Sequence, residues 1–377
     1  MTSLFRPRHA ALSLALFAAL SLTACQTSVK TAPATATAAS QPADRTVVTR
    51  APGNGLYEMA YSSSANALYV ASADRFKEAN GGVVYRLDPV TLATQSVTYT
   101  DLKNFGTASD EQAGVFYTTN SLDGAITKLD AQSGKVLDRL VFPEKKDKKG
   151  YPAGTREMLV HEDELYVGRI ADPGFISVVD ARTFKLKKTL HHAGKWVTGL
   201  IYSPLMKRIY AANGSGEILV INPRTHNIEQ RWTPGDGQPW LFLNMAEDPA
   251  SGRLFVTDNS KGKATLVFDE RSGKVIHRID GDALAITYSA ARHALFISQR
   301  ESKKVLELDA STFAVKHSWS FNAHPNSLLL SPDHQTLYVT LKQKFRKGSP
   351  APAADEIARI ALDSGPLPVA DQPEVRK

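Results

Sequence analysis

The fold is decided by a stretch that begins Leu254-Phe255-Val256-Thr257-Asp258-Asn259 and continues into Val267-Phe268-Asp269 and Ser272-Gly273-Lys274-Val275-Ile276. Three runs rich in β-forming residues are separated by short polar segments. An Asp that follows a strand accepts hydrogen bonds from the backbone two residues on, and a Gly adopts the positive φ of a tight turn. The stretch therefore predicts three short antiparallel strands.

This pattern recurs along the whole chain. The first run of each copy centres on an aromatic anchor, and successive anchors lie 41 to 50 residues apart. The anchors are Tyr69, Phe116, Tyr166, Tyr210, Phe255, Phe296 and Tyr338. Another apolar run precedes each anchor, so each copy supplies four strands and no amphipathic helix. Such a repeat is typical of a β-propeller blade, and we predict an all-β fold, a seven-bladed β-propeller.

The last repeat is one strand short. After Tyr338 the chain supplies a third strand at residues 357–363, and then it becomes polar and rich in Pro. The segment Arg45-Thr46-Val47-Val48-Thr49-Arg50 has the pattern of the missing outer strand. We predict that this N-terminal strand pairs into the last blade and closes the ring, which removes exposed sheet edges. The predicted propeller spans residues 45–365 and is followed by a flexible tail, residues 366–377.

The N-terminus has the pattern of a secretory signal. Arg6 and Arg8 precede an apolar run, residues 10–22, which is too short to span a bilayer comfortably. The sequence Leu22-Thr23-Ala24-Cys25 resembles the lipobox of bacterial lipoproteins, and Cys25 is the chain's single cysteine. The resemblance implies a signal peptide over residues 1–24 and a lipid on Cys25. The alternative is an ordinary signal peptide whose cysteine is incidental.

The segment after the cysteine predicts a flexible tether. Residues 25–44 are rich in Ala, Thr, Ser and Pro and cannot bury a core. Gln26 follows the cysteine, and the lipoprotein resemblance then implies sorting to the outer membrane. We therefore expect a protein of the bacterial cell envelope that is lipid-anchored in the outer membrane and faces the periplasm.

Composition and charge exclude several classes of protein. The lone cysteine excludes a disulfide framework and a cysteine-based metal cluster. The formal net charge is +7, and it falls to +5 without the first 24 residues, which is too low for a dedicated DNA-binding domain. No helix with paired histidines and no Gly-x-Ser-x-Gly motif is present. We predict no catalytic residue, no metal site and no cofactor.

Several strings carry a resemblance to a known family. Leu337-Tyr338-Val339-Thr340 resembles the YVTN repeat of the surface-layer-like propeller family. Residues 57–62, 81–92 and 324–328 are similar to the YncE-like periplasmic members of that family. The resemblance covers about residues 45–363. It implies a seven-bladed propeller with a binding role and no established reaction, and it is compatible with either an anchored or a freely soluble protein.

Propellers commonly bind ligands at the mouth of the central channel, where the inner strands begin. Aligning the blades by their anchors selects seven channel-mouth candidates, Tyr57, Glu58, Phe105, Arg156, Glu157, Asn244 and Asn326. The loops that lead into this level add Trp196, Trp240 and His324. Aromatic faces, a guanidinium and amides together suit an extended or planar polar ligand. The alternative is that these side chains only pack against and cap the inner strands.

Basic residues cluster in two loops. These polyanion-binding candidates are Lys145, Lys146, Lys148, Lys149, Lys342, Lys344, Arg346 and Lys347. Such loops are often only solvated surface, but they also suit a flexible polyanion. If the aromatic candidates share a face with them, single-stranded nucleic acid becomes a suitable partner, because bases stack on aromatic rings while lysines neutralise phosphates.

Two function classes follow from this pattern. We favour a monomeric, non-enzymatic envelope scaffold that presents one propeller face to a protein or a polyanion such as single-stranded DNA. The alternative is a propeller enzyme acting at the channel. A lactonase would use His324, Arg156 and Glu157, whereas a quinoprotein would need a tryptophan against its cofactor and acids such as Glu58 and Glu157.

Overall fold

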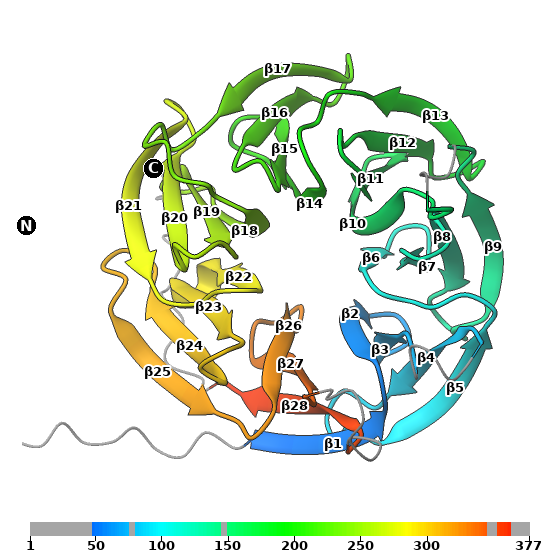
Figure 1. Ribbon diagram of the computed structural model, residues 1–377. Helices are drawn as coiled ribbons and strands as arrows, with labels where there is room; N and C mark the ends of the chain where they lie inside the picture. The colour runs from blue at the N-terminus through cyan, green and yellow to red at the C-terminus, as the bar shows by residue number, and fades with distance from the viewer. Residues whose placement is uncertain (1–46, 75–79, 145–148, 345–352, 363–377) are drawn as a thin grey trace, which may run out of the picture. The chain divides into compact units, whose positions relative to one another are not determined.

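The computed structural model describes residues 47–74, 80–144, 149–344 and 353–362. These residues form seven four-stranded antiparallel sheets. The sheets stand as blades around a central axis (Figure 1). This arrangement confirms the predicted all-β, seven-bladed propeller. Within these residues the one helical element is a short 3₁₀ turn, η1 (Ala290–Arg292), and no helix has the length and apolar character needed to cross a membrane.

Each blade runs from an inner strand beside the axis to an outer strand at the rim. Blade 1 holds β2 (Leu56–Ser62), β3 (Ala67–Ser72), β4 (Gly82–Leu87) and β5 (Thr94–Thr100). Blade 2 holds β6 (Thr107–Asp110), β7 (Val115–Asn120), β8 (Ala125–Asp130) and β9 (Val136–Val141). Blade 3 holds β10 (Gly154–His161), β11 (Glu164–Ile170), β12 (Ile176–Asp180) and β13 (Lys185–Leu190).

The remaining blades follow the same order. Blade 4 holds β14 (Val197–Ser203), β15 (Arg208–Asn213), β16 (Ile218–Asn222) and β17 (Asn227–Trp232). Blade 5 holds β18 (Phe242–Asp248), β19 (Arg253–Asp258), β20 (Ala264–Asp269) and β21 (Lys274–Asp280). Blade 6 holds β22 (Ile286–Ser289), β23 (Ala294–Gln299), β24 (Lys304–Asp309) and β25 (Val315–Ser320). Blade 7 holds β26 (His324–Leu330), β27 (Thr336–Lys342), β28 (Asp355–Ala361) and β1 (Val47–Gly53).

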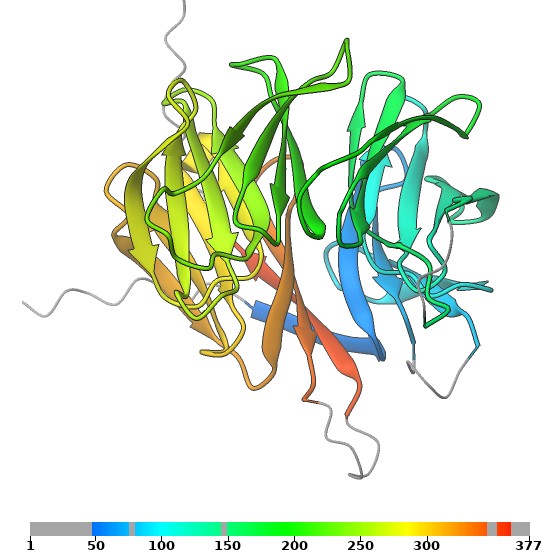
Figure 2. The same ribbon diagram turned by 45° about the horizontal axis from the view of Figure 1, so that its top comes forward.

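The ring closes through the two ends of the described chain. Strand β1 pairs antiparallel with β28, with Val48 opposite Arg359 and Thr49 opposite Ala358. Figure 2 shows the blue β1 beside the red β28. The prediction that an N-terminal strand completes the last blade is therefore confirmed. The predicted signal peptide, Cys25, the tether and the C-terminal tail from residue 366 lie outside the described residues.

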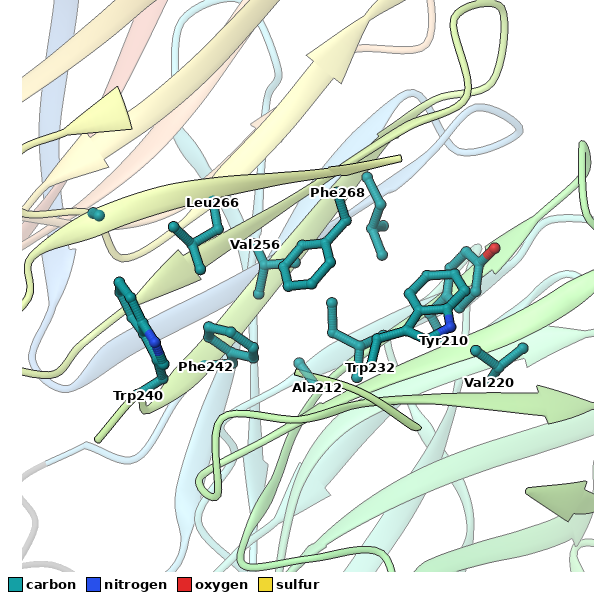
Figure 3. Close-up of a cluster of buried hydrophobic side chains, with 12 residues drawn as sticks. Tyr210, Ala212, Val220, Trp232, Trp240, Phe242, Val256, Leu266 and Phe268 are labelled. Carbon is teal, nitrogen blue, oxygen red and sulfur yellow. The ribbon is translucent and has the colours of Figure 1, made fainter. Parts of the chain in front are cut away.

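The hydrophobic core is divided among the interfaces between neighbouring blades. Figure 3 shows the cluster between blades 4 and 5, where Tyr210 and Trp232 lie on one side and Phe242 and Phe268 on the other. Each aromatic anchor is buried in one of seven such clusters. The middle strands are almost wholly buried, while outer strands such as β5 are largely exposed. Packing between sheets therefore explains why each repeat needs an aromatic residue at its second strand.

Candidate functional site

The inner strands share an irregularity near their starts. The pairing register of β2 shifts between Leu56 and Met59, and that of β10 shifts between Thr155 and Met158. Equivalent shifts occur in β14, β18 and β26. A bulge re-aims the side chains beside it. Consecutive residues such as Arg156 and Glu157 can therefore both line the axis, where a regular strand would turn one of them away.

A cavity of about 340 Å³ lies at this level and takes lining residues from all seven blades. It brings together six of the channel-mouth candidates. These are Tyr57, Glu58, Arg156, Glu157, Asn244 and Asn326. The alignment of blades by their anchors therefore places residues of different blades around one space. Which ligand fits this cavity depends on the chemistry of its lining side chains.

Two glutamates in the cavity have raised pKa values. Burial raises the pKa of Glu58, although a hydrogen bond from the Thr107 backbone N–H to its Oε2 (2.9 Å) and the nearby Arg156 charge act against it. Burial also holds the pKa of Glu157 well above its ordinary value, and repulsion by Glu58 adds to this. Like charges close together in a desolvated site favour retention of a proton by the pair.

Several polar groups around the channel join adjacent blades. Arg156 Nε donates to the Thr198 carbonyl (3.1 Å), and Thr198 Oγ1 donates to the Phe242 carbonyl (2.6 Å). Asn244 Nδ2 donates to the Leu284 carbonyl (2.7 Å). Because these bonds cross from one inner strand to the next, part of the candidate set has a structural role in holding the ring together.

Glycines allow the inner strands to approach each other closely. A Cβ on Gly106 would lie 2.3 Å from the Arg156 carbonyl oxygen, and a Cβ on Gly199 would lie 2.3 Å from the Leu243 carbonyl oxygen. Neither contact is tolerable for a real side chain. Glycine at these two positions therefore sets the width of the ring around the cavity.

The other four channel-mouth candidates do not line the cavity. Phe105 packs edge-on against Tyr57 with ring centroids 4.7 Å apart. Trp240 is buried between blades 4 and 5, where its Nε1 donates to Asp236 Oδ1 (2.8 Å). His324 Nδ1 lies 2.8 Å from the Arg300 carbonyl oxygen.

Trp196 lies at the surface beside the channel. It is 36% exposed, and the Lys195 ammonium lies 4.2 Å from its ring centroid. Of the residues that the two enzyme interpretations use, Glu58, Arg156 and Glu157 line the cavity. His324 is not among the cavity-lining residues, and Trp240 belongs to the core.

The basic candidates have different surroundings. Lys342 is half-enclosed at the ring closure, where its ammonium lies 3.3 Å from Asp355 Oδ2 and 3.8 Å from the Tyr57 ring centroid. Burial lowers the pKa of Lys342. Lys149 and Lys344 are exposed. The other candidates, Lys145, Lys146, Lys148, Arg346 and Lys347, lie outside the described residues.

Sequence analysis missed Arg300 and Thr107, which also line the cavity. Arg300 follows the anchor Phe296 by four residues, and Lys342 has the same place after Tyr338. That position lies at or directly after the end of the second strand, at the same end of the blade as the start of the inner strand. A comparison of blades at this position, as well as at the inner strands, would have found Arg300.

Comparison with known proteins agrees with the class defined by the fold, a seven-bladed propeller with a polar central cavity. The uncharacterized protein YncE of Salmonella typhi is 36% identical over 318 residues, which cover 83% of this chain and 90% of that protein. YncE of Escherichia coli matches over the same shares at the same identity. Antigen Lp49 of Leptospira interrogans is 25% identical over 264 residues, 67% of this chain and 57% of that protein. No protein-family model matches the chain.

The chain belongs to the YncE family of propellers.

Proposed function

We propose that the protein is a non-enzymatic binding scaffold of the bacterial cell envelope whose ligand is a flexible polyanion such as single-stranded DNA. The binding surface is the start face, defined as the end of the ring at which each inner strand begins. The loops after each second strand and after each outer strand lie at this end, since the strands of a blade alternate in direction. A protein partner is the alternative ligand.

Exposed lysines in the loops of the start face carry this proposal. They are Lys149, Lys261 and Lys344. Acids such as Asp101 and Asp282 also lie at this end, and bases such as Arg182 and Arg224 lie at the opposite end, so the proposal rests on these loop lysines and on the aromatic contact beside them.

Trp196 and Lys195 form the most suitable contact for a nucleotide. Lys195 carries no ion pair within the described residues, and its ammonium covers the Trp196 ring. A base that stacks on this ring would displace the ammonium, which can then neutralise the adjacent phosphate. Lys344 and Arg300 are exposed on the same face. Stacking together with charge neutralisation is how proteins bind single strands without reading their sequence.

The proposal places the scaffold in the envelope through its N-terminus. A lipid on Cys25 and the following tether would hold the propeller at the outer membrane, with freedom to turn its start face toward the periplasm. The support for this step is the single cysteine at the position where a lipoprotein signal requires it.

A gel-shift titration with single-stranded oligonucleotides tests the proposal. We expect the logarithm of affinity to fall linearly with the logarithm of salt concentration. Replacing Lys195 and Lys344 by Gln should reduce the slope by about 0.7 for each lost phosphate contact. Trp196→Ala should weaken binding by roughly 1–3 kcal/mol and leave the slope unchanged.

Matched variants separate this surface from general effects. Tyr99→Ala removes an aromatic ring that is 81% exposed on the outer strand β5, and Lys185→Gln removes an exposed lysine on the outer strand β13. Both should bind as the unaltered protein does. Absence of any shift at micromolar protein in low salt would reject the polyanion, and crosslinking in cells would then identify a protein partner.

A further inference from the structure

The wall of the central cavity combines charged and apolar residues. Blades 1 to 3 supply Tyr57, Glu58, Arg156 and Glu157. Blades 4 to 7 supply Arg300 and several amides together with aliphatic and methionine residues, which also pack into the interfaces between blades. These apolar residues include Leu200, Met245, Ile286, Leu328 and Leu329. A ligand that fills the cavity must therefore offer polar groups and also some apolar surface.

The charged residues hold hydrogen-bonding groups that the fold leaves unused. Within the described residues, neither carboxylate oxygen of Glu157 accepts a hydrogen bond, and Glu58 uses only Oε2. Arg156 donates through Nε alone, so its two terminal nitrogens have no hydrogen-bond partner in the described part of the chain. Enclosed polar groups are normally satisfied by protein, water or ligand. These atoms are therefore available to a bound molecule.

A second guanidinium lies beside this group. Arg300 Nη1 is 3.4 Å from Asn326 Oδ1, a long contact that leaves most of its donors available. The cavity thus combines two carboxylates with two guanidiniums. Tyr57, whose hydroxyl has no hydrogen bond within the described residues, experiences the charges of both arginines.

We propose that the cavity binds a small zwitterion with an apolar body, an apolar α-amino acid or short peptide. Its ammonium group lies at Glu58 and Glu157, its carboxylate at Arg156 and Arg300, and its side chain against the apolar residues of the wall. This proposal goes beyond the proposed function, and its site shares Arg300 with the start face.

Charge and size favour this ligand class over others. An ammonium group carries three donors and no acceptor, which matches the unused carboxylate oxygens. A bare metal ion is disfavoured because the Arg156 charge acts on both glutamates. A volume of about 340 Å³ lies near the lower end of the range for small-molecule sites, which suits an amino acid or dipeptide better than a large cofactor.

Calorimetric titration of the purified full chain tests the proposal with four probes. L-leucine and L-leucyl-L-leucine carry both charges, L-leucinamide carries only the ammonium, and N-acetyl-L-leucine carries only the carboxylate. We expect at least one zwitterion to bind at least about tenfold more tightly than either singly charged probe. Comparing the two zwitterions identifies a free amino acid or a peptide as the source.

The variant Glu157→Gln gives the sharpest control, because its carboxylate takes part in no hydrogen bond of the described structure. The fold should therefore survive, which a melting curve verifies. We expect affinity for the zwitterion to fall at least about tenfold. Glu162→Gln, at a side chain that is 84% exposed in a turn far along β10, should bind as the unaltered protein does.

Proton release provides a readout that a merely structural role would not change. Tyr57, Glu58, Arg156, Glu157 and Arg300 are the titratable groups that line the cavity. An ammonium group placed at the glutamates favours their ionisation, so binding should release a proton, measured as a dependence of the heat on the buffer's ionisation enthalpy. Glu157→Gln should abolish that release.

The arginine side is tested by Arg300→Gln. We expect this variant to bind L-leucine no more tightly than L-leucinamide, while the control Arg224→Gln, an exposed residue on a turn of blade 4, keeps the discrimination. No heat with either zwitterion at millimolar concentration overturns the proposal. Equal binding of all probes, or unchanged affinity in Glu157→Gln, overturns it as well.

Discussion

Tyrosine anchors connect their blades to a neighbouring blade by a hydrogen bond as well as by packing. Tyr69 Oη donates to the Ala131 carbonyl (3.1 Å), and Tyr338 Oη donates to the Pro89 carbonyl (2.8 Å). Both acceptors lie in the turn that precedes the outer strand of the neighbouring blade. Burial raises the pKa of these phenols, so they remain donors across the neutral range. The hydroxyl thereby fixes the orientation of one sheet against the next.

Tyr338→Phe should destabilise the propeller by about 1 kcal/mol, because the buried Pro89 carbonyl loses its partner while the packing is kept. Chemical unfolding at equilibrium measures this change. Tyr61→Phe is the matched control, since the Tyr61 hydroxyl bonds to Asn66 at an exposed site, and it should cost much less. Equal effects of the two variants would contradict a structural role for the Tyr338 hydroxyl.

Two buried glutamates between blades 4 and 5 compete for one hydroxyl. Ser203 Oγ lies 2.7 Å from Glu247 Oε1 and 2.8 Å from Glu270 Oε2, yet it has a single proton to donate. Glu270 is fully buried and Glu247 is 8% exposed. Burial raises the pKa of Glu247 to about 7. The pair therefore retains a proton in the folded chain at neutral and lower pH.

This retained proton predicts a pH dependence of stability. The folded chain holds the proton more tightly than the unfolded chain, in which Glu titrates at about 4.5. The stabilisation is thus fully present below the unfolded value and is lost as pH rises toward about 7. In this window the free energy of unfolding should fall by up to about 1.4 kcal/mol per pH unit.

Unfolding curves recorded between about pH 5 and pH 8 measure that slope. Glu247→Gln should make it shallower, because an amide does not titrate; the Glu58–Glu157 pair, whose pKa values are also raised, contributes the remainder. Glu162→Gln should leave it unchanged. An unchanged slope in Glu247→Gln would assign the titration to other groups.

At the scale of elements, β1 belongs to the last blade although no loop connects it to the other three strands of that blade. It contributes backbone hydrogen bonds to β28, and just after it Leu56 N donates to Asp355 Oδ2 (3.0 Å). Lys342 Nζ in turn donates to the Leu56 carbonyl (2.8 Å). The closure between blades 7 and 1 therefore combines a strand pair with a buried ion pair.

Deleting residues 44–50 should destabilise the protein by a few kcal/mol or cause aggregation, since it removes most of β1 and exposes the edge of β28. Thermal melting and light scattering measure the effect. In the opposite direction, Thr49→Cys with Ala358→Cys joins residues that face each other across the closure, and the oxidised form should melt higher than the reduced form. An unchanged melting curve after the deletion would contradict the closure.

The blade repeat was predictable because anchor spacing and turn residues are local signals. The closing strand was predictable from a count, since the last repeat lacked one strand. The start of the inner strand of blade 2 was less predictable, because the channel-mouth candidate Phe105 precedes β6. The Phe105 carbonyl accepts a hydrogen bond from Glu58 N in the neighbouring blade, and single-strand patterning does not report such contacts.

At the scale of the whole molecule, sequence placed Glu58, Arg156 and Glu157 at the channel, where they lie, but it also placed Trp240 there, and the structure buries that side chain between blades 4 and 5. Aligning the blades by their anchors predicts how far along the channel axis each residue lies. It does not tell whether a side chain points to the axis or into the interface between blades, since that depends on the bulges and on packing. The tryptophan was selected by its position in a loop, and the structure uses it as core.

The last prediction concerns where the molecule resides. Under the proposed function, Cys25 carries the lipid that holds the propeller at the membrane. Cys25→Ser should then move the protein from the membrane fraction to the soluble periplasmic fraction, because the variant cannot accept the lipid and an apolar run this short does not anchor once it is cleaved. Fractionation and immunoblotting measure the distribution, and Ser28→Ala, three residues further along the tether, is the control that should stay with the membrane. Equal membrane association of the Cys25→Ser protein would reject lipidation and leave an ordinary secreted propeller.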